Sequence, residues 1–205
     1  MIRLFYAPGA CSLASHIALE EAGAEYRAVK VDTAAGDQRQ PEYLAINPKG
    51  RVPALATEAG TLTETPAILA WIAQAYPKAG LAPPDPWGFA QAQAFNNYLA
   101  ATVHVAHAHG RRGYRWASEQ SSFADMKAKV AANMAECFQL IEDDLLAGPW
   151  VLGDAFSICD GYLFTIAGWL KGDGVDIARF PKVAAHFERV AARDAVRKVL
   201  ASEAS

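Results

Sequence analysis

The stretch Tyr6-Ala7-Pro8-Gly9-Ala10-Cys11-Ser12-Leu13 joins a short apolar strand to a helix. Residues 2–6 predict a buried strand, and the apolar residues of 13–22 recur at helical spacing until Gly23. Cys11 therefore lies where a helix begins, and the unpaired N–H groups and the helix dipole there stabilise a thiolate. We expect the pKa of Cys11 to lie below its usual value of about 8.5. A buried, inert cysteine is the alternative interpretation.

Composition and charge exclude several classes of protein. The 205 residues are 52% hydrophobic and 20% charged, which is typical of a folded chain with a substantial core. A net charge of −3 and the lack of a long basic run argue against nucleic acid as a partner. No apolar run is long enough to span a bilayer, so no membrane partner is expected. Pro8-Gly9 interrupts any signal-peptide core, which favours a cytoplasmic location.

The cysteines and histidines predict neither a disulfide framework nor a metal site. Cys11, Cys137 and Cys159 cannot all pair within one chain, and free thiols in a reducing cytoplasm are the natural interpretation. Cys137 belongs to an apolar stripe, and Cys159 lies in an apolar setting at a helix start, so both are expected to be structural. His104 and His107 are close in sequence, but no carboxylate lies at matching spacing, so no metal is expected.

Residues 1–77 alternate predicted strands and helices. Thr65 is the predicted N-cap of the last helix of this part, with Pro66 at its first position, and residues 32–40 are expected to be loop. The order β-α-β-α-β-β-α predicts a small mixed sheet with helices on it. The predicted strands are 2–6, 26–31, 54–57 and 61–63, the last two forming a hairpin, and the predicted helices begin at 13, 41 and 66.

The second part of the chain is predicted to be all-helical. Residues 77–86 contain four prolines, so we place a linker at 78–87 and a helical domain at 88–205. Ser157-Ile158-Cys159-Asp160 fits a capping box at a helix start. Helical stripes are predicted within residues 89–106, 126–145, 162–170 and 183–191, with a possible last helix at 196–200.

This arrangement resembles the cytosolic glutathione transferases, and two stretches are most similar to the bacterial beta class. They are FYAPGACSLASH at residues 5–16 and LAINPKGRVP at residues 44–53, and the similarity extends to WVLG at 150–153. The resemblance implies a thioredoxin-like domain over residues 1–77 and an all-helical domain over 88–205. It also implies a homodimer that binds glutathione in the cleft between the domains.

The resemblance assigns roles to several residues of the first domain. The Val52-Pro53 bond is expected to be cis, since cis is cheap only before proline. The N–H and C=O of Val52 would then pair with glutathione as an added strand, whereas a plain turn proline is the alternative. Thr65, at a helix start, would receive the γ-glutamyl carboxylate. Glu64 would hold the γ-glutamyl ammonium, or would simply be solvated at a favourable helix end.

Asn97 and His104 are predicted to share one face of a long helix, because they are two helical turns apart. Ala101 and Ala108 fall on the same face and leave room for a ligand. In the beta class the matching Asn and His reach glutathione and the cysteine sulfur, with help from the partner subunit. A structural histidine is the alternative interpretation of His104.

The sequence also departs from the beta-class pattern. Thr102 and Val105 stand where some members have Glu and Lys, and loop 32–40 lacks the Lys that contacts the glycine end of glutathione. Arg39 is the candidate substitute for that contact. The run HGRRGYRW at residues 109–116 would lie near the second-substrate pocket, or form a solvated basic loop.

We therefore predict a glutathione transferase in which Cys11 and His104 are catalytic and glutathione is the co-substrate. Its thiolate would attack a small hydrophobic electrophile. Cys11 would assist by a hydrogen bond or form a mixed disulfide with glutathione. One alternative is a glutathione-dependent thiol–disulfide oxidoreductase using Cys11, although no C-x-x-C resolving thiol follows it. The other is a non-catalytic dimer that binds glutathione or hydrophobic ligands.

Overall fold

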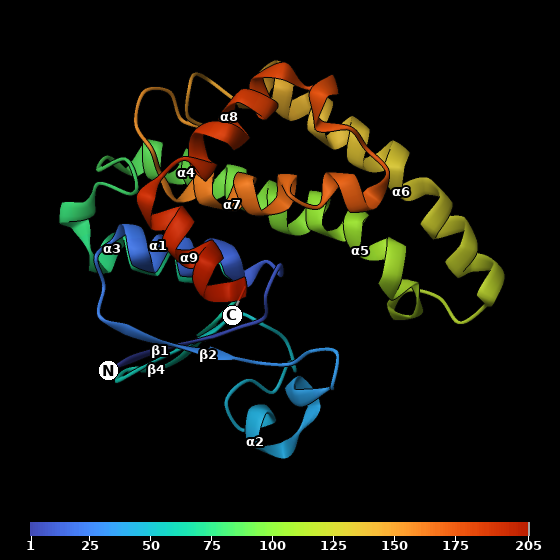
Figure 1. Cartoon of the computed structure of the whole chain (residues 1–205), viewed down its shortest axis with the longest axis horizontal. Helices are drawn as coiled ribbons and strands as arrows, with labels where there is room; N and C mark the ends of the chain where they lie inside the picture. Colours follow the sequence, from blue (N-terminus) through green and yellow to red (C-terminus); the bar gives the residue numbers. More distant parts are fainter. Residues whose placement is uncertain (205) are drawn as a thin grey trace.

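A four-stranded mixed sheet forms one end of the molecule, and helices cover both of its faces (Figure 1). The computed structural model describes residues 1–204. Strands β1 and β2 are parallel, whereas β3 is antiparallel to both β1 and β4. This thioredoxin-like arrangement confirms the predicted α/β domain. The strands are β1 (Ile2–Tyr6), β2 (Tyr26–Lys30), β3 (Ala54–Thr57) and β4 (Gly60–Thr63), in the order β2-β1-β3-β4.

Alternation of side chains along β1 explains why both faces of the sheet are covered. Leu4 pairs in register with Leu55 and is fully buried beneath α1 (Ser12–Glu21) and α3 (Thr65–Ala75). Phe5 faces the opposite side, where the short helix α2 (Pro41–Leu44) lies (Figure 1). The rings of Phe5 and Tyr43 meet edge to face there, with centroids 5.9 Å apart.

The start of α3 differs from the predicted one in its capping residue. Glu64, not Thr65, is the N-cap, and Thr65 and Pro66 are the first two helical residues. Glu64 has a φ of 74°, which a residue with a side chain rarely adopts and which costs conformational energy. The bend directs both Glu64 and Thr65 to the wall of a single cavity.

The remaining chain is helical, as predicted, and packs above α1 and α3 (Figure 1). Single 3₁₀ turns occupy residues 37–39, 77–79, 113–115, 170–173 and 177–179, the first of them in the stretch predicted to be loop. The longer helices are α4 (Pro86–Tyr98), α5 (His104–Arg112), α6 (Gln120–Leu140), α7 (Ile158–Ala167), α8 (Pro181–Ala191) and α9 (Asp194–Ala204). Two π-helical turns, Leu99–Val103 and Ile141–Leu145, interrupt the helical half.

Helix α7 is buried along its whole length and joins the two halves. Gly161 permits its close approach to α1, since a Cβ there would lie 3.2 Å from the Ile17 side chain. The predicted capping box is confirmed. The Ser157 hydroxyl accepts from the Cys159 N–H at 3.2 Å, and the Asp160 carboxylate accepts from the Ser157 N–H at 2.7 Å.

The last helix is longer than predicted and returns to the sheet domain, where α9 lies beside α1 (Figure 1). Its Glu203 is buried and lies 2.9 Å from His16 Nδ1. The second carboxylate oxygen of Glu203 accepts from the Gly9 N–H at 3.4 Å. The end of the chain therefore supports the turn that precedes Cys11.

Candidate active site

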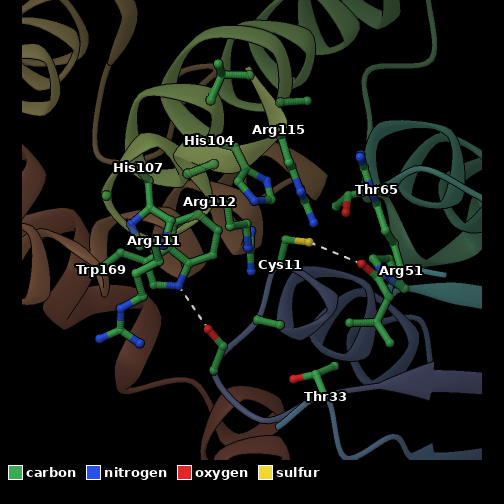
Figure 2. Close-up of a pocket in the computed structure, with 18 of the residues that line it drawn as sticks. Cys11, Thr33, Arg51, Thr65, His104, His107, Arg111, Arg112, Arg115 and Trp169 are labelled. Atoms are coloured by element: carbon green, nitrogen blue, oxygen red, sulfur yellow. Dashed lines mark hydrogen bonds between the residues drawn. The ribbon is translucent and has the colours of Figure 1, made fainter. Parts of the chain in front are cut away.

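A cavity of about 1200 Å³ opens between the sheet domain and the helical half (Figure 2). Its walls bring together every predicted site residue except Asn97. From the sheet domain these are Cys11, Arg39, Val52, Pro53, Glu64 and Thr65, and from the helical half His104.

Cys11 lies at the start of helix α1, as predicted, and lines the cavity (Figure 2). The Sγ–H donates to the carbonyl of Val52 at 3.5 Å, and the Val52-Pro53 bond is cis as expected. The prediction of a low pKa for the Cys11 thiol is wrong. Burial raises the pKa of the Cys11 thiol, and the opposing effects of the Thr65 hydroxyl and the Arg112 charge are smaller. At neutral pH Cys11 is therefore a thiol that can donate a hydrogen bond.

His104 begins helix α5 and faces the same cavity as Cys11 (Figure 2). Burial, followed by the charge of Arg112, lowers the pKa of His104 to about 4. The imidazole is therefore neutral at pH 7 and can donate one hydrogen bond and accept another. Its ring packs edge-on against Trp169, with centroids 4.9 Å apart.

Trp169 is a site residue that the sequence did not reveal. Its indole N–H donates to the Gly9 carbonyl at 2.9 Å, and so ties the turn before Cys11 to the helical half. His107 stacks on the same indole at 4.4 Å and pairs with Asp173 at 2.8 Å. No local pattern could predict these contacts, because Trp169 and Gly9 are far apart in sequence.

The prediction that Asn97 shares a face with His104 is wrong. Asn97 is exposed, its amide donates to the Gln93 carbonyl at 2.8 Å, and it does not line the cavity. Ala101 is exposed as well, whereas Ala108 lines the cavity. The reason is the π-helical turn Leu99–Val103, which needs more residues per turn than an α-helix. It rotates α5 relative to α4, so a seven-residue spacing no longer returns to one face.

The cavity is strongly cationic although the whole chain is slightly acidic. Seven Lys and Arg side chains line it, against two acidic ones. Both acids are engaged, Glu64 with Lys49 at 2.6 Å and Asp173 with His107. The basic run at residues 109–116 is not a remote loop, because it includes the end of α5 and the 3₁₀ turn that follows. Its Arg111, Arg112 and Arg115 line the cavity (Figure 2).

Within residues 1–204, no three His, Cys, Asp or Glu side chains come together as ligands for a metal ion. None of the helices in that range combines the length and the apolar character that crossing a membrane requires.

The sheet domain, the helical half and the thiol-lined cavity between them define a two-domain protein of the thioredoxin-like class. Two family models agree with this division. Residues 1–74 match the glutathione S-transferase N-terminal domain, and residues 85–189 match the glutathione S-transferase C-terminal domain. The chain is also 34% identical to the glutathione S-transferase GstA of Escherichia coli O157:H7, over 98% of each chain. The chain belongs to the glutathione S-transferase family.

Solved structures give the same result. A glutathione transferase homologue from Sulfitobacter, solved with bound glutathione, is 51% identical, with a TM-score of 0.96 over 98% of each chain. The beta-class glutathione S-transferase of Sphingomonas chungbukensis is 36% identical, with a TM-score of 0.86 over 98% of each chain. The similarity to the bacterial beta class is therefore present in structure as well as in sequence.

Proposed function

We propose that this chain conjugates the thiol of glutathione to small hydrophobic electrophiles. The observation that carries the proposal is the cavity itself, which places the Cys11 thiol, the Val52-Pro53 turn and the start of α3 on one wall. The Sulfitobacter relative, whose structure holds glutathione, supports the same assignment. A turnover screen with aryl halides, epoxides, hydroperoxides and glutathione mixed disulfides tests it. Binding of glutathione without turnover of any electrophile would favour a non-catalytic binding protein instead.

We infer that glutathione lies along the sheet-domain wall. The first N–H groups of α3 lack intrahelical partners and, with the Thr65 hydroxyl, suit the γ-glutamyl carboxylate. Glu64 is the candidate partner of the γ-glutamyl ammonium. The Val52 peptide can pair with the backbone of glutathione as an added strand. Arg39, which also lines the cavity, would take the glycine carboxylate.

The sulfur of glutathione would then lie among Cys11, His104 and Arg112. The protonated Cys11 thiol and the neutral His104 imidazole can each donate a hydrogen bond to a thiolate. Arg112 lines the same cavity and supplies a positive charge that acts on Cys11, which supports a role for it beside the sulfur. The thiol proton leaves to water, the thiolate forms a bond to the electrophilic carbon, and the leaving group departs with the electron pair. The reaction is accelerated because the site positions the glutathione sulfur against the electrophile and lowers the pKa of the glutathione thiol.

Thr65→Ala should weaken glutathione binding by roughly 1–3 kcal/mol, because a charged partner loses a hydrogen-bond donor. This corresponds to a dissociation constant raised about 5- to 150-fold, measured by calorimetry. Thr65→Ser is the matched control, since it keeps the hydroxyl and should bind nearly as the wild type does. Equal affinity of the alanine variant and the wild type would remove Thr65 from the site.

We also propose that the chain acts as a cytoplasmic homodimer. Asn97 and Ala101 are exposed on the outward surface between α4 and α5. A partner subunit could bind this surface, and Asn97 would then lie beside the partner's cleft. A stable interface of this kind should bury more than about 1,000 Å². Light scattering at micromolar concentration should give the mass of two chains. A monomeric mass would contradict both the dimer and the role of Asn97.

A further inference from the structure

The cavity holds more positive charge than the carboxylates and the thiolate of bound glutathione can neutralise. Arg51, Arg112 and Arg115 all act electrostatically on His104, which places them around one part of the cavity. Arg112 and Arg115 extend from the helical half toward Cys11 (Figure 2). None of the three forms an ion pair within 4 Å with any acidic group among residues 1–204.

Like charges that lie close together repel one another, and Arg112 is partly buried while Arg51 and Arg115 are exposed. Burial, followed by the charge of Arg115, lowers the pKa of the Arg112 guanidinium. Elsewhere in the chain a comparable arginine is neutralised. The Arg193 guanidinium donates two hydrogen bonds to the Glu21 carboxylate in a bidentate ion pair, at 2.5 and 2.7 Å. The cluster at the cavity therefore lacks the anion that the fold supplies to Arg193.

Glutathione accounts for only part of this charge. Its two carboxylates are placed by the proposed function on the sheet-domain wall, at Thr65 and Arg39, and its thiolate would face Arg112. Arg115 lies on the opposite wall and is left without an anionic partner when the tripeptide is in place. A planar guanidinium in this situation suits a carboxylate, which it can bind through two parallel hydrogen bonds.

We propose that the second substrate carries a carboxylate, which Arg115 binds with help from Arg51, while its electrophilic carbon faces the glutathione sulfur. This inference rests on the proposed function, because it names the chemical class of the electrophile. Apolar residues on the same wall, Val105 and Ala108, are suited to the uncharged body of such a substrate. The cationic walls also concentrate organic anions at the cavity mouth, an effect that salt weakens.

The probe is a pair of electrophiles that differ in one charge, 4-(isothiocyanatomethyl)benzoate and its primary amide. In both, glutathione sulfur bonds to the isothiocyanate carbon, the C=N electron pair moves to nitrogen, and the nitrogen takes a proton. The methylene group separates the charge from the reacting carbon, and each enzymatic rate is divided by the uncatalysed rate. We expect kcat/KM for the carboxylate to exceed that for the amide by roughly tenfold or more, as a charged hydrogen bond allows.

Arg115→Gln should remove most of this preference, and the double variant Arg51→Gln with Arg115→Gln should abolish it. Arg27→Gln, an exposed arginine on β2 away from the cavity, is the matched control and should keep the preference. The preference of the wild type should also fall as ionic strength rises from about 0.01 to about 1 M.

Three results are distinguishable. Equal turnover of acid and amide by the wild type would overturn the inference and leave the proposed function intact. An Arg115→Gln variant with a raised KM for glutathione and an unchanged preference would also overturn it, by assigning Arg115 to glutathione. Glutathione binding without turnover of either probe, or of the wider screen, would instead refute the conjugation that the inference rests on.

Discussion

Replacing Asp160 by alanine should lower the stability of the fold by about 3–5 kcal/mol, the range for removing one partner of a buried pair while the other groups stay buried. Asp160 is fully buried at the start of α7. Its carboxylate accepts from the Val151 N–H at 2.7 Å and from the Ser157 N–H and hydroxyl at 2.7 and 2.8 Å, and it lies 2.8 Å from His186 Nε2. Alanine leaves all four groups buried without this partner.

Calorimetry at a fixed protein concentration should show a melting temperature lower by roughly 6–20 °C for a chain of this size. Asp160→Asn, which keeps the shape but turns one acceptor into a donor, should fall between the alanine variant and the wild type. Asp125→Ala, at an exposed position on α6, is the control for removal of a carboxylate and should change little. A melting temperature of Asp160→Ala equal to that of the control would show that the network does not stabilise α7.

The fold was predictable from sequence because its signals are local. Three of these signals each depend only on residues that are close together in the sequence. They are the strand-to-helix turn at Cys11, the hairpin at 54–63 and the capping box at Ser157. Helix α9 was underestimated for a related reason. Its polar residues weaken the periodic pattern, and its position depends on Glu203 reaching His16 and Gly9 at the other end of the chain.

The site was predictable in part, and its errors have physical causes. A helix-face argument assumes 3.6 residues per turn, so the π-helical turn Leu99–Val103 invalidated it for Asn97. The dipole argument for Cys11 omitted desolvation, which depends on how deeply the folded chain buries the sulfur. Trp169 could not be found, because its partner Gly9 belongs to the other domain. The arginine run could be flagged as a candidate, but only the fold places it at the cavity.

The corrected pKa of Cys11 sharpens the choice between the two chemistries. Disulfide exchange needs the Cys11 thiolate, and a raised pKa makes that species scarce at pH 7. Conjugation needs only a hydrogen-bond donor beside the sulfur of glutathione, which the protonated thiol provides. The remaining cysteines offer no resolving thiol, since Cys137 and Cys159 are buried in the helical half. Conjugation should therefore be the main activity, with exchange as a side reaction that rises as pH increases toward the raised pKa.

Cys11→Ala should lower conjugation by roughly ten- to a hundredfold and not abolish it, because one hydrogen-bond donor is lost while the nucleophile belongs to glutathione. Cys11→Ser is the matched variant. Its hydroxyl restores the donor but cannot form a disulfide, so it should recover conjugation and leave exchange absent. Both activities are measured in the three proteins, and intact mass reports any glutathione adduct on Cys11. The opposite result would be strong disulfide exchange by the wild type at pH 7, with no conjugation of any electrophile. If both the serine and the alanine variant abolished that exchange, Cys11 would be the covalent nucleophile and this ranking would be reversed.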